Sequence, residues 1–85
     1  MTLYKLIKLI PNSWPEPDGA VVTDYHDNEH SLDWDFGKNK ISIGVHMNGD
    51  VDWAALIDGV EVSGQALGPK QIPLEIMDIF KRLGY

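Results

Sequence analysis

The chain has 85 residues, a formal net charge of −6 and no cysteine. This length is enough for one domain with a single modest core, and the lack of cysteine excludes disulfides and thiolate metal sites. We therefore expect residues 1–85 to form a single domain in the cytoplasm. Because a core of this size contributes only about 3–5 kcal/mol of net stability, we expect either tight packing or a homodimer to supplement it.

The charge is unevenly distributed along the chain. Residues 10–36 contain seven acids and no lysine or arginine, whereas the bases gather near the two ends and around residues 38–40. Nucleic-acid binding depends on neutralising the phosphate backbone, so an acidic surface argues against direct DNA or RNA binding. We expect a protein partner with a basic surface instead.

The N-terminal segment, residues 1–10, places apolar side chains at helical spacing and predicts a short helix, with a strand as the alternative. Lys8 interrupts this apolar run and Pro11 ends it, so we expect neither a targeting segment nor a membrane span. Residues 11–19 contain three prolines and a glycine, which predicts an extended connector. Trp14 in this connector is expected to be half-exposed and to contact a partner.

Between residues 20 and 67, alternating apolar runs are separated by turn signals about ten residues apart. These signals are Gly37-Lys38-Asn39, Asn48-Gly49-Asp50 and Asp58-Gly59. They predict an antiparallel meander of four or five strands. Period-two alternation predicts one solvent face and one buried face, with Trp34, Met47 and Trp53 on the buried face. Gly64 is expected to mark a bulge or a bend.

Residues 73–83 have the features of a C-terminal helix. Pro73 suits the first helical position, acidic residues come early and basic residues late, and Gly84 follows as a stop. The broad apolar stripe of this helix needs an apolar surface to cover. The predicted fold class is therefore α+β, in which an antiparallel meander carries the C-terminal helix on one face beside the short N-terminal element.

A series of short motifs runs through the second part of the chain. They are Leu32-Asp33-Trp34, Gly37, Ile41-Ser42-Ile43, Asn48-Gly49, Trp53 and Ile72-Pro73-Leu74. In this order the motifs resemble a group of small bacterial and phage proteins with no settled activity that combine a sheet with a helix. The resemblance implies a sheet-plus-helix fold and brings no catalytic residues.

The segment His26-Asp27-Asn28-Glu29-His30 has the His-x-x-Glu-His spacing of inverted zinc peptidases. In those enzymes the motif lies on a helix, where two imidazoles reach one zinc ion and the glutamate acts as the base. Here a strand pattern follows and no helical periodicity surrounds the motif, so a polar turn is the favoured interpretation. A metal-dependent hydrolase using His26, Glu29 and His30 is the alternative, and we expect no cofactor.

A group of carboxylates follows the same alternation. Asp33 and Asp35 lie two residues apart on one predicted strand and share its solvent face, with Asp52 and Glu61 expected as neighbours on adjacent strands. These acids have three interpretations: a solvated face, an acidic docking surface, or paired carboxylates for acid–base catalysis. A solvated face is the most common role of such residues.

From these features we expect a non-enzymatic acidic protein that acts by binding another protein. Small, acidic, cofactor-free chains of bacteria and phages commonly serve as inhibitors, antitoxins, immunity proteins or anti-CRISPR proteins. The residues expected to contact the partner are Trp14, Asp24, Asp27, Glu29, Asp33, Asp35, Asp52 and Glu61. A structural oligomerisation module is a further interpretation, in which the outward-facing Ala54 and Leu56 form the contact between copies.

Overall fold

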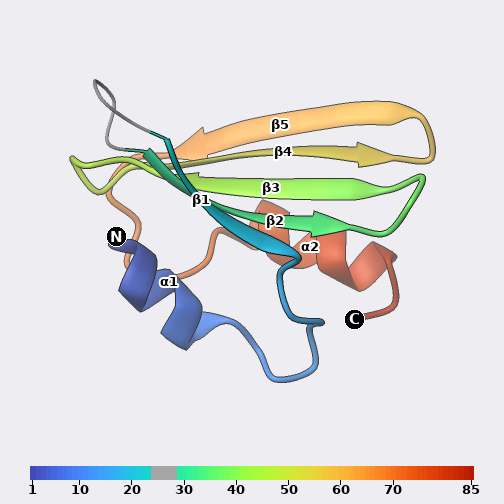
Figure 1. Ribbon diagram of the computed structural model, residues 1–85, viewed down its shortest axis with the longest axis horizontal. Coiled ribbons are helices and arrows are strands. Elements are labelled where there is room, and N and C mark those ends of the chain that lie inside the picture. Colours follow the sequence, from blue (N-terminus) through green and yellow to red (C-terminus); the bar gives the residue numbers. More distant parts are fainter. Residues whose placement is uncertain (24–28) are drawn as a thin grey trace.

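The computed structural model describes the backbone of residues 1–23 and 29–85 and the side chains of residues 1–18 and 30–85. Two helices flank five strands along the chain (Figure 1). The elements are α1 (Leu3–Leu9), β1 (Gly19–Thr23), β2 (Glu29–Asp35), β3 (Lys40–Val45), β4 (Val51–Ile57), β5 (Val60–Ala66) and α2 (Leu74–Arg82). The predicted α+β class is confirmed, and the N-terminal element is the helix rather than the strand.

The strands form one antiparallel sheet in the order β1-β2-β3-β4-β5, so each strand pairs with its neighbour in sequence. The tightest turn joins β4 to β5 through Asp58 and Gly59, whose φ angles of 50° and 82° both lie in the left-handed region. This is the two-residue turn whose twist matches that of the flanking strands. It fixes the register of Val51 against Ala66 through Ile57 against Val60, without an unpaired residue.

Both helices and the connector lie on the same side of the sheet (Figure 1), and an aromatic cluster joins them to it. The Phe80 ring of α2 stacks on Trp14 of the connector, with ring centroids 3.7 Å apart and planes 10° apart. Trp34 of β2 meets the same Phe80 ring edge-on, with centroids 5.0 Å apart. Its indole Nε1–H donates to the Pro15 carbonyl at 2.9 Å. The connector is therefore fixed to the core rather than loose.

This packing overturns the expectation for Trp14. The side chain is 8% exposed and belongs to the core, so its assignment as a half-exposed contact residue is wrong. The prolines and glycine around Trp14 follow neither helical nor strand spacing, so the sequence does not show which residue packs against it. The stacking on Phe80, which lies far away in the sequence, supplies the apolar cover that Trp14 needs.

Two further sequence predictions fail in the sheet. Met47 lies two residues beyond the end of β3 at Val45 and is 77% exposed, so it is not on the buried face. Gly64 is not a bulge, because it pairs in regular register with Trp53. A Cβ atom on Gly64 would come within 2.5 Å of Trp53 Cζ2. The glycine is there because the neighbouring indole ring occupies the space that a side chain would need.

Replacing Gly64 with alanine is therefore expected to destabilise the fold by about 2 kcal/mol, since an added methyl group forces the buried indole to move. Urea unfolding followed by tryptophan fluorescence measures the loss. Ser63→Ala is the matched control, because Ser63 is the exposed neighbour on the same strand and such surface changes stay within about 0.5 kcal/mol. Equal unfolding midpoints for the two variants would contradict the packing described here.

Candidate functional site

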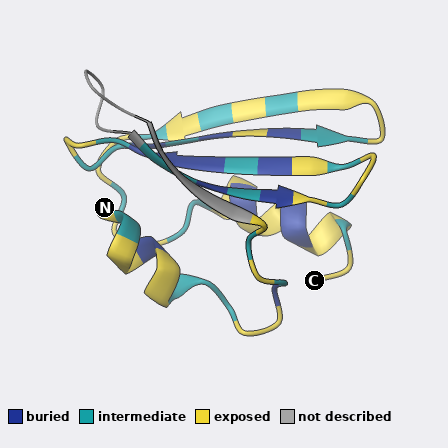
Figure 2. Cartoon of the chain, in the orientation of Figure 1, coloured by how far each residue is buried: buried dark blue, intermediate teal, exposed yellow. Residues whose placement is uncertain are grey.

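The face of the sheet opposite the helices is open to solvent over β2–β5. Within the described residues, both helices lie on the other side of the sheet (Figure 1), and the burial colours alternate along β5 as expected for a strand with one open face (Figure 2). We call this surface the outer face and define it by the outward-pointing side chains of the four strands. They are Ser31, Asp33, Asp35, Lys40, Ser42, Asp52, Ala54, Leu56, Glu61, Ser63 and Gln65.

The strand register arranges these side chains in cross-strand rows. One row runs Asp33, Ser42, Ala54, Ser63 and the next runs Asp35, Lys40, Leu56, Glu61. An open concavity of about 700 Å³ lies over these two rows, and a second one of about 510 Å³ adjoins it toward Asp52 and Gln65. The outer face is therefore hollowed along its centre, where small or apolar side chains lie beside Lys40, and its acids lie toward the borders.

Acids on different strands of the outer face lie too far apart to act as a catalytic pair. Lys40 and Leu56 separate Asp35 from Glu61 in their row, so at about 4.8 Å per strand these two positions lie roughly 14 Å apart. Asp52 and Glu61 are thus not the direct neighbours of Asp33 and Asp35 that the sequence suggested. With Lys40 as the single base among four acids, the outer face carries a net negative charge.

Local hydrogen bonds fix Asp35 at one border of this surface. Its Oδ1 accepts the N–H of Gly37 at 2.9 Å, which closes the turn between β2 and β3. Its own N–H donates to Asp18 Oδ2 at 2.6 Å, and the Asp18 N–H donates to the Asp33 carbonyl at 2.8 Å. The connector thereby fixes the strand that presents the acids.

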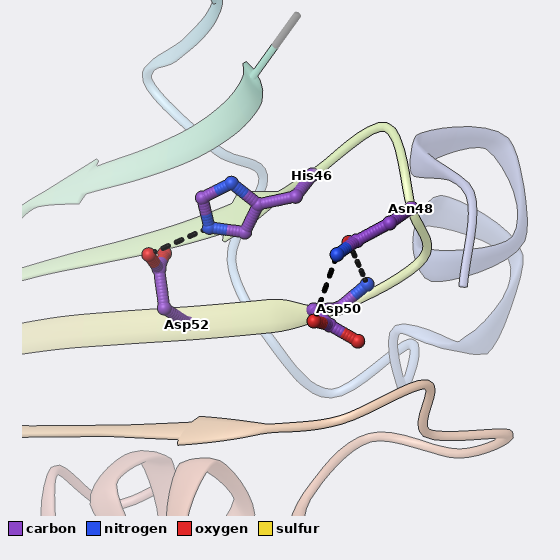
Figure 3. A network of polar contacts seen from close by, with 4 residues as sticks. All are labelled: His46, Asn48, Asp50 and Asp52. Carbon is purple, nitrogen blue, oxygen red and sulfur yellow. Dashed lines mark hydrogen bonds and ion pairs between the residues drawn. The ribbon is translucent and has the colours of Figure 1, made fainter. Parts of the chain in front are cut away.

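A polar network holds the opposite end of the outer face (Figure 3). The His46 ring points at Asp52, with Nε2 2.8 Å from Oδ2. In the adjoining turn the Asn48 side chain donates to the Asp50 carboxylate and accepts the Asp50 N–H, both at 3.0 Å. Asp50 Oδ1 also accepts the N–H of Gly68 at 2.8 Å. The His46 contact orients Asp52, and the bond from Gly68 to Asp50 ties the β3–β4 turn to the segment after β5.

The other sequence-predicted site residues fall in three groups. Asp24, His26 and Asp27 lie outside the described residues, and Glu29 is placed only as the first backbone position of β2. His30 also belongs to β2, so the Glu29–His30 part of the zinc-peptidase motif is in a strand and lacks the helix that the chemistry requires. Within the described residues, no three histidine or acidic side chains are grouped to hold a metal ion.

The pair expected to form an oligomer contact lies on the outer face. Ala54 is exposed and Leu56 is half-buried, and both line the larger concavity. Lys40, the base in the middle of the acids, was missed as a site residue. The same period-two alternation could have revealed it, since it lies two residues before Ser42. The contact between His46 and Asp52 depends on the register of the β3–β4 hairpin, which the alternation alone does not give.

Comparison of the chain with protein-family models, curated proteins and solved structures gives no match. Within the described residues, neither helix has the length and apolar character to cross a membrane.

Proposed function

We propose that the chain is a non-enzymatic binding protein whose outer face docks a basic segment of a partner protein. One observation carries this proposal: a hollowed sheet face that neither described helix covers, with Ala54 and Leu56 at its centre and four carboxylates against one ammonium group. A complementary partner has lysine or arginine around a small apolar centre. Such charge complementarity mainly raises the association rate and excludes partners of like charge, and it contributes less to the affinity itself.

The size of the outer face sets the strength expected of this interaction. With strand spacings of about 4.8 Å and rises of about 3.3 Å per residue, β2–β5 offer roughly 400 Å². A standard interface buries about 800 Å² on each partner. We therefore expect a transient complex, or a partner that also contacts the surface beyond this face.

The exposure of the acids makes the proposed interaction sensitive to salt. Asp35, Lys40 and Glu61 are exposed and Asp33 and Asp52 half-buried, so counterions have access to all of them. Charges farther apart than about 10 Å are screened at 0.1 M salt. Ala54 and Leu56 at the centre contribute apolar contact that salt does not weaken. Binding should thus fall, but not vanish, as salt is added.

Among functions of this kind, we propose an inhibitor, antitoxin, immunity or anti-CRISPR type of protein acting in the cytoplasm of a bacterium. These proteins act by occupying the surface of another protein, and an acidic sheet face suits a target that uses basic residues. The geometry supports the binding mode; the class rests on the small size and acidity of the chain.

Affinity capture with a neutralised variant tests the proposal. The variant replaces each acid of the outer face by its amide, which keeps the shape and one of the two acceptor oxygens: Asp33→Asn, Asp35→Asn, Asp52→Asn and Glu61→Gln. The control removes the same number of charges elsewhere on the surface: Glu16→Gln, Asp58→Asn, Glu75→Gln and Asp78→Asn. Both are compared with the original chain on the same bacterial lysate.

We expect the original chain and the control to capture the same basic protein and the neutralised variant to lose it. With each exposed charge contributing about 0.5 kcal/mol, four of them change the dissociation constant roughly 30-fold. Titration of the captured protein against all three chains measures this factor. Equal affinities of the neutralised variant and the control would remove the outer face as the docking surface.

A further inference from the structure

Strand β5 forms an edge of the sheet that lacks the usual protection against pairing. Within the described residues β4 is its one neighbour, and its pairing is regular along all seven residues. Edge strands of natural proteins are commonly protected by proline, lysine, a bulge or a cover. The sequence of β5, Val-Glu-Val-Ser-Gly-Gln-Ala, has no proline or lysine and a single charge, at Glu61.

The β4–β5 turn determines which backbone groups of β5 face outward. Ile57 and Val60 flank the two-residue turn, the place of a hydrogen-bonded pair in such a hairpin. The β2–β3 turn shows the same arrangement, where the Phe36 N–H donates to the Asn39 carbonyl. Bonded and non-bonded pairs then alternate along an antiparallel ladder. The N–H and C=O groups of Glu61, Ser63 and Gln65 therefore point away from β4, toward the free side.

We propose that this edge pairs with β5 of a second copy of the chain, antiparallel and centred on Ser63. In this register Ser63 faces its own counterpart, and Glu61 faces Gln65 of the other copy. Each facing pair exchanges two hydrogen bonds, so the three pairs make about six and satisfy every outward group. A shift by two residues leaves two facing pairs and about four bonds. The centred register is thus the most favourable one.

The side chains agree with this register. Glu61 meets the neutral amide of Gln65 from the second copy, and the two Glu61 carboxylates stay apart. The register thus avoids like charges directly opposite each other, which would destabilise the strand pair. Beneath the edge, a groove of about 340 Å³ is lined by Trp53 and Ile79. Val62 of the second copy faces Gly64, the residue beside the Trp53 ring. Val60, which is 60% exposed, faces Ala66 of the second copy and becomes less exposed.

Sedimentation equilibrium over a concentration series tests this dimer through two substitutions at one exposed position. Gln65→Glu places a carboxylate opposite Glu61 of the other copy and should weaken the dimer about tenfold, since the change acts at both symmetric ends. Gln65→Lys places an ammonium group there and should tighten it by a similar factor. A monomeric original chain, or two variants that shift in the same direction or not at all, would overturn the proposal.

A third variant tests the backbone contact itself. Ser63→Pro removes the N–H at the centre of the edge while leaving the bonds to β4, so we expect a monomer with an unchanged circular dichroism spectrum. Ser63→Thr keeps the N–H and should remain a dimer. If Ser63→Pro fails to fold, the two Gln65 variants decide the outcome. A folded Ser63→Pro dimer would contradict the proposal, whereas the docking proposal is tested separately by the neutralised variant and its control, which leave the β5 backbone unchanged.

Discussion

Replacing Phe80 with alanine is expected to leave about half of the molecules unfolded in the absence of denaturant. The ring is fully buried, stacked on Trp14 at 3.7 Å between centroids and set edge-on to Trp34 at 5.0 Å. Truncating a buried phenylalanine costs about 3–5 kcal/mol. A core of this size supplies about 3–5 kcal/mol of net stability. The single substitution therefore removes about as much free energy as the fold has.

The reason for so large an effect is the position of Phe80 between three parts of the chain. It joins α2 to the connector through Trp14 and to the sheet through Trp34. Because Trp34 also donates its indole N–H to Pro15, loss of the ring loosens the packing on both sides of that hydrogen bond. The helix, the connector and β2 should therefore lose their order together.

Urea unfolding followed by tryptophan fluorescence and circular dichroism measures this effect. Leu74→Ala on the same helix is the control, because Leu74 is 78% exposed and its truncation should change stability by less than about 0.5 kcal/mol. A Phe80→Ala chain that unfolds at the same urea concentration as the control would show that the aromatic cluster does not hold the helix on the sheet.

Reversing two charges of the outer face, Asp33→Lys with Glu61→Lys, is expected to abolish partner binding. The balance of four acids and one base becomes two acids and three bases, so a basic partner meets repulsion in place of attraction. Like-charge juxtaposition across an interface costs several kcal/mol, which corresponds to a loss of affinity of at least about 100-fold. The effect should exceed that of neutralising all four acids.

The matched control for this reversal is Glu16→Lys with Asp78→Lys, which changes the net charge equally at two exposed positions away from the outer face. Calorimetric titration of the captured partner is carried out at low and at high salt. The reversed face should lose most of its affinity at low salt, where the control keeps it. An equal loss in both variants would mean that net charge, rather than the outer face, governs binding.

The sequence predicted those parts of the fold that depend on local pattern. Alternation from residue 31 onward placed Trp34 and Trp53 inside and Asp33 and Asp35 outside, because strand side chains point to opposite faces in turn. The turn signals likewise predicted the order of the strands. The C-terminal helix was recognisable from Pro73 and from its distribution of charges.

The failures concern contacts that no local pattern contains. Trp14 was misjudged because its cover, Phe80, comes from the far end of the chain. Gly64 was mistaken for a bulge because its reason lies across the ladder, in the ring of Trp53. Similarly, the faces of Asp52 and Glu61 followed from alternation, but their distance from Asp33 and Asp35 followed only from the register. The residues of the outer face could thus be predicted from the sequence, but their positions relative to one another could not.

Backbone amide chemical shifts measured during titration with the captured partner test the docking proposal most directly. We predict that the largest changes fall on the outward-facing residues of β2–β5, with Asp33, Ser42, Ala54 and Ser63 among them, and that α1 and α2 change little. Changes concentrated on the two helices, with the outer face unaffected, would show that the partner binds the other side of the molecule and would contradict the proposal.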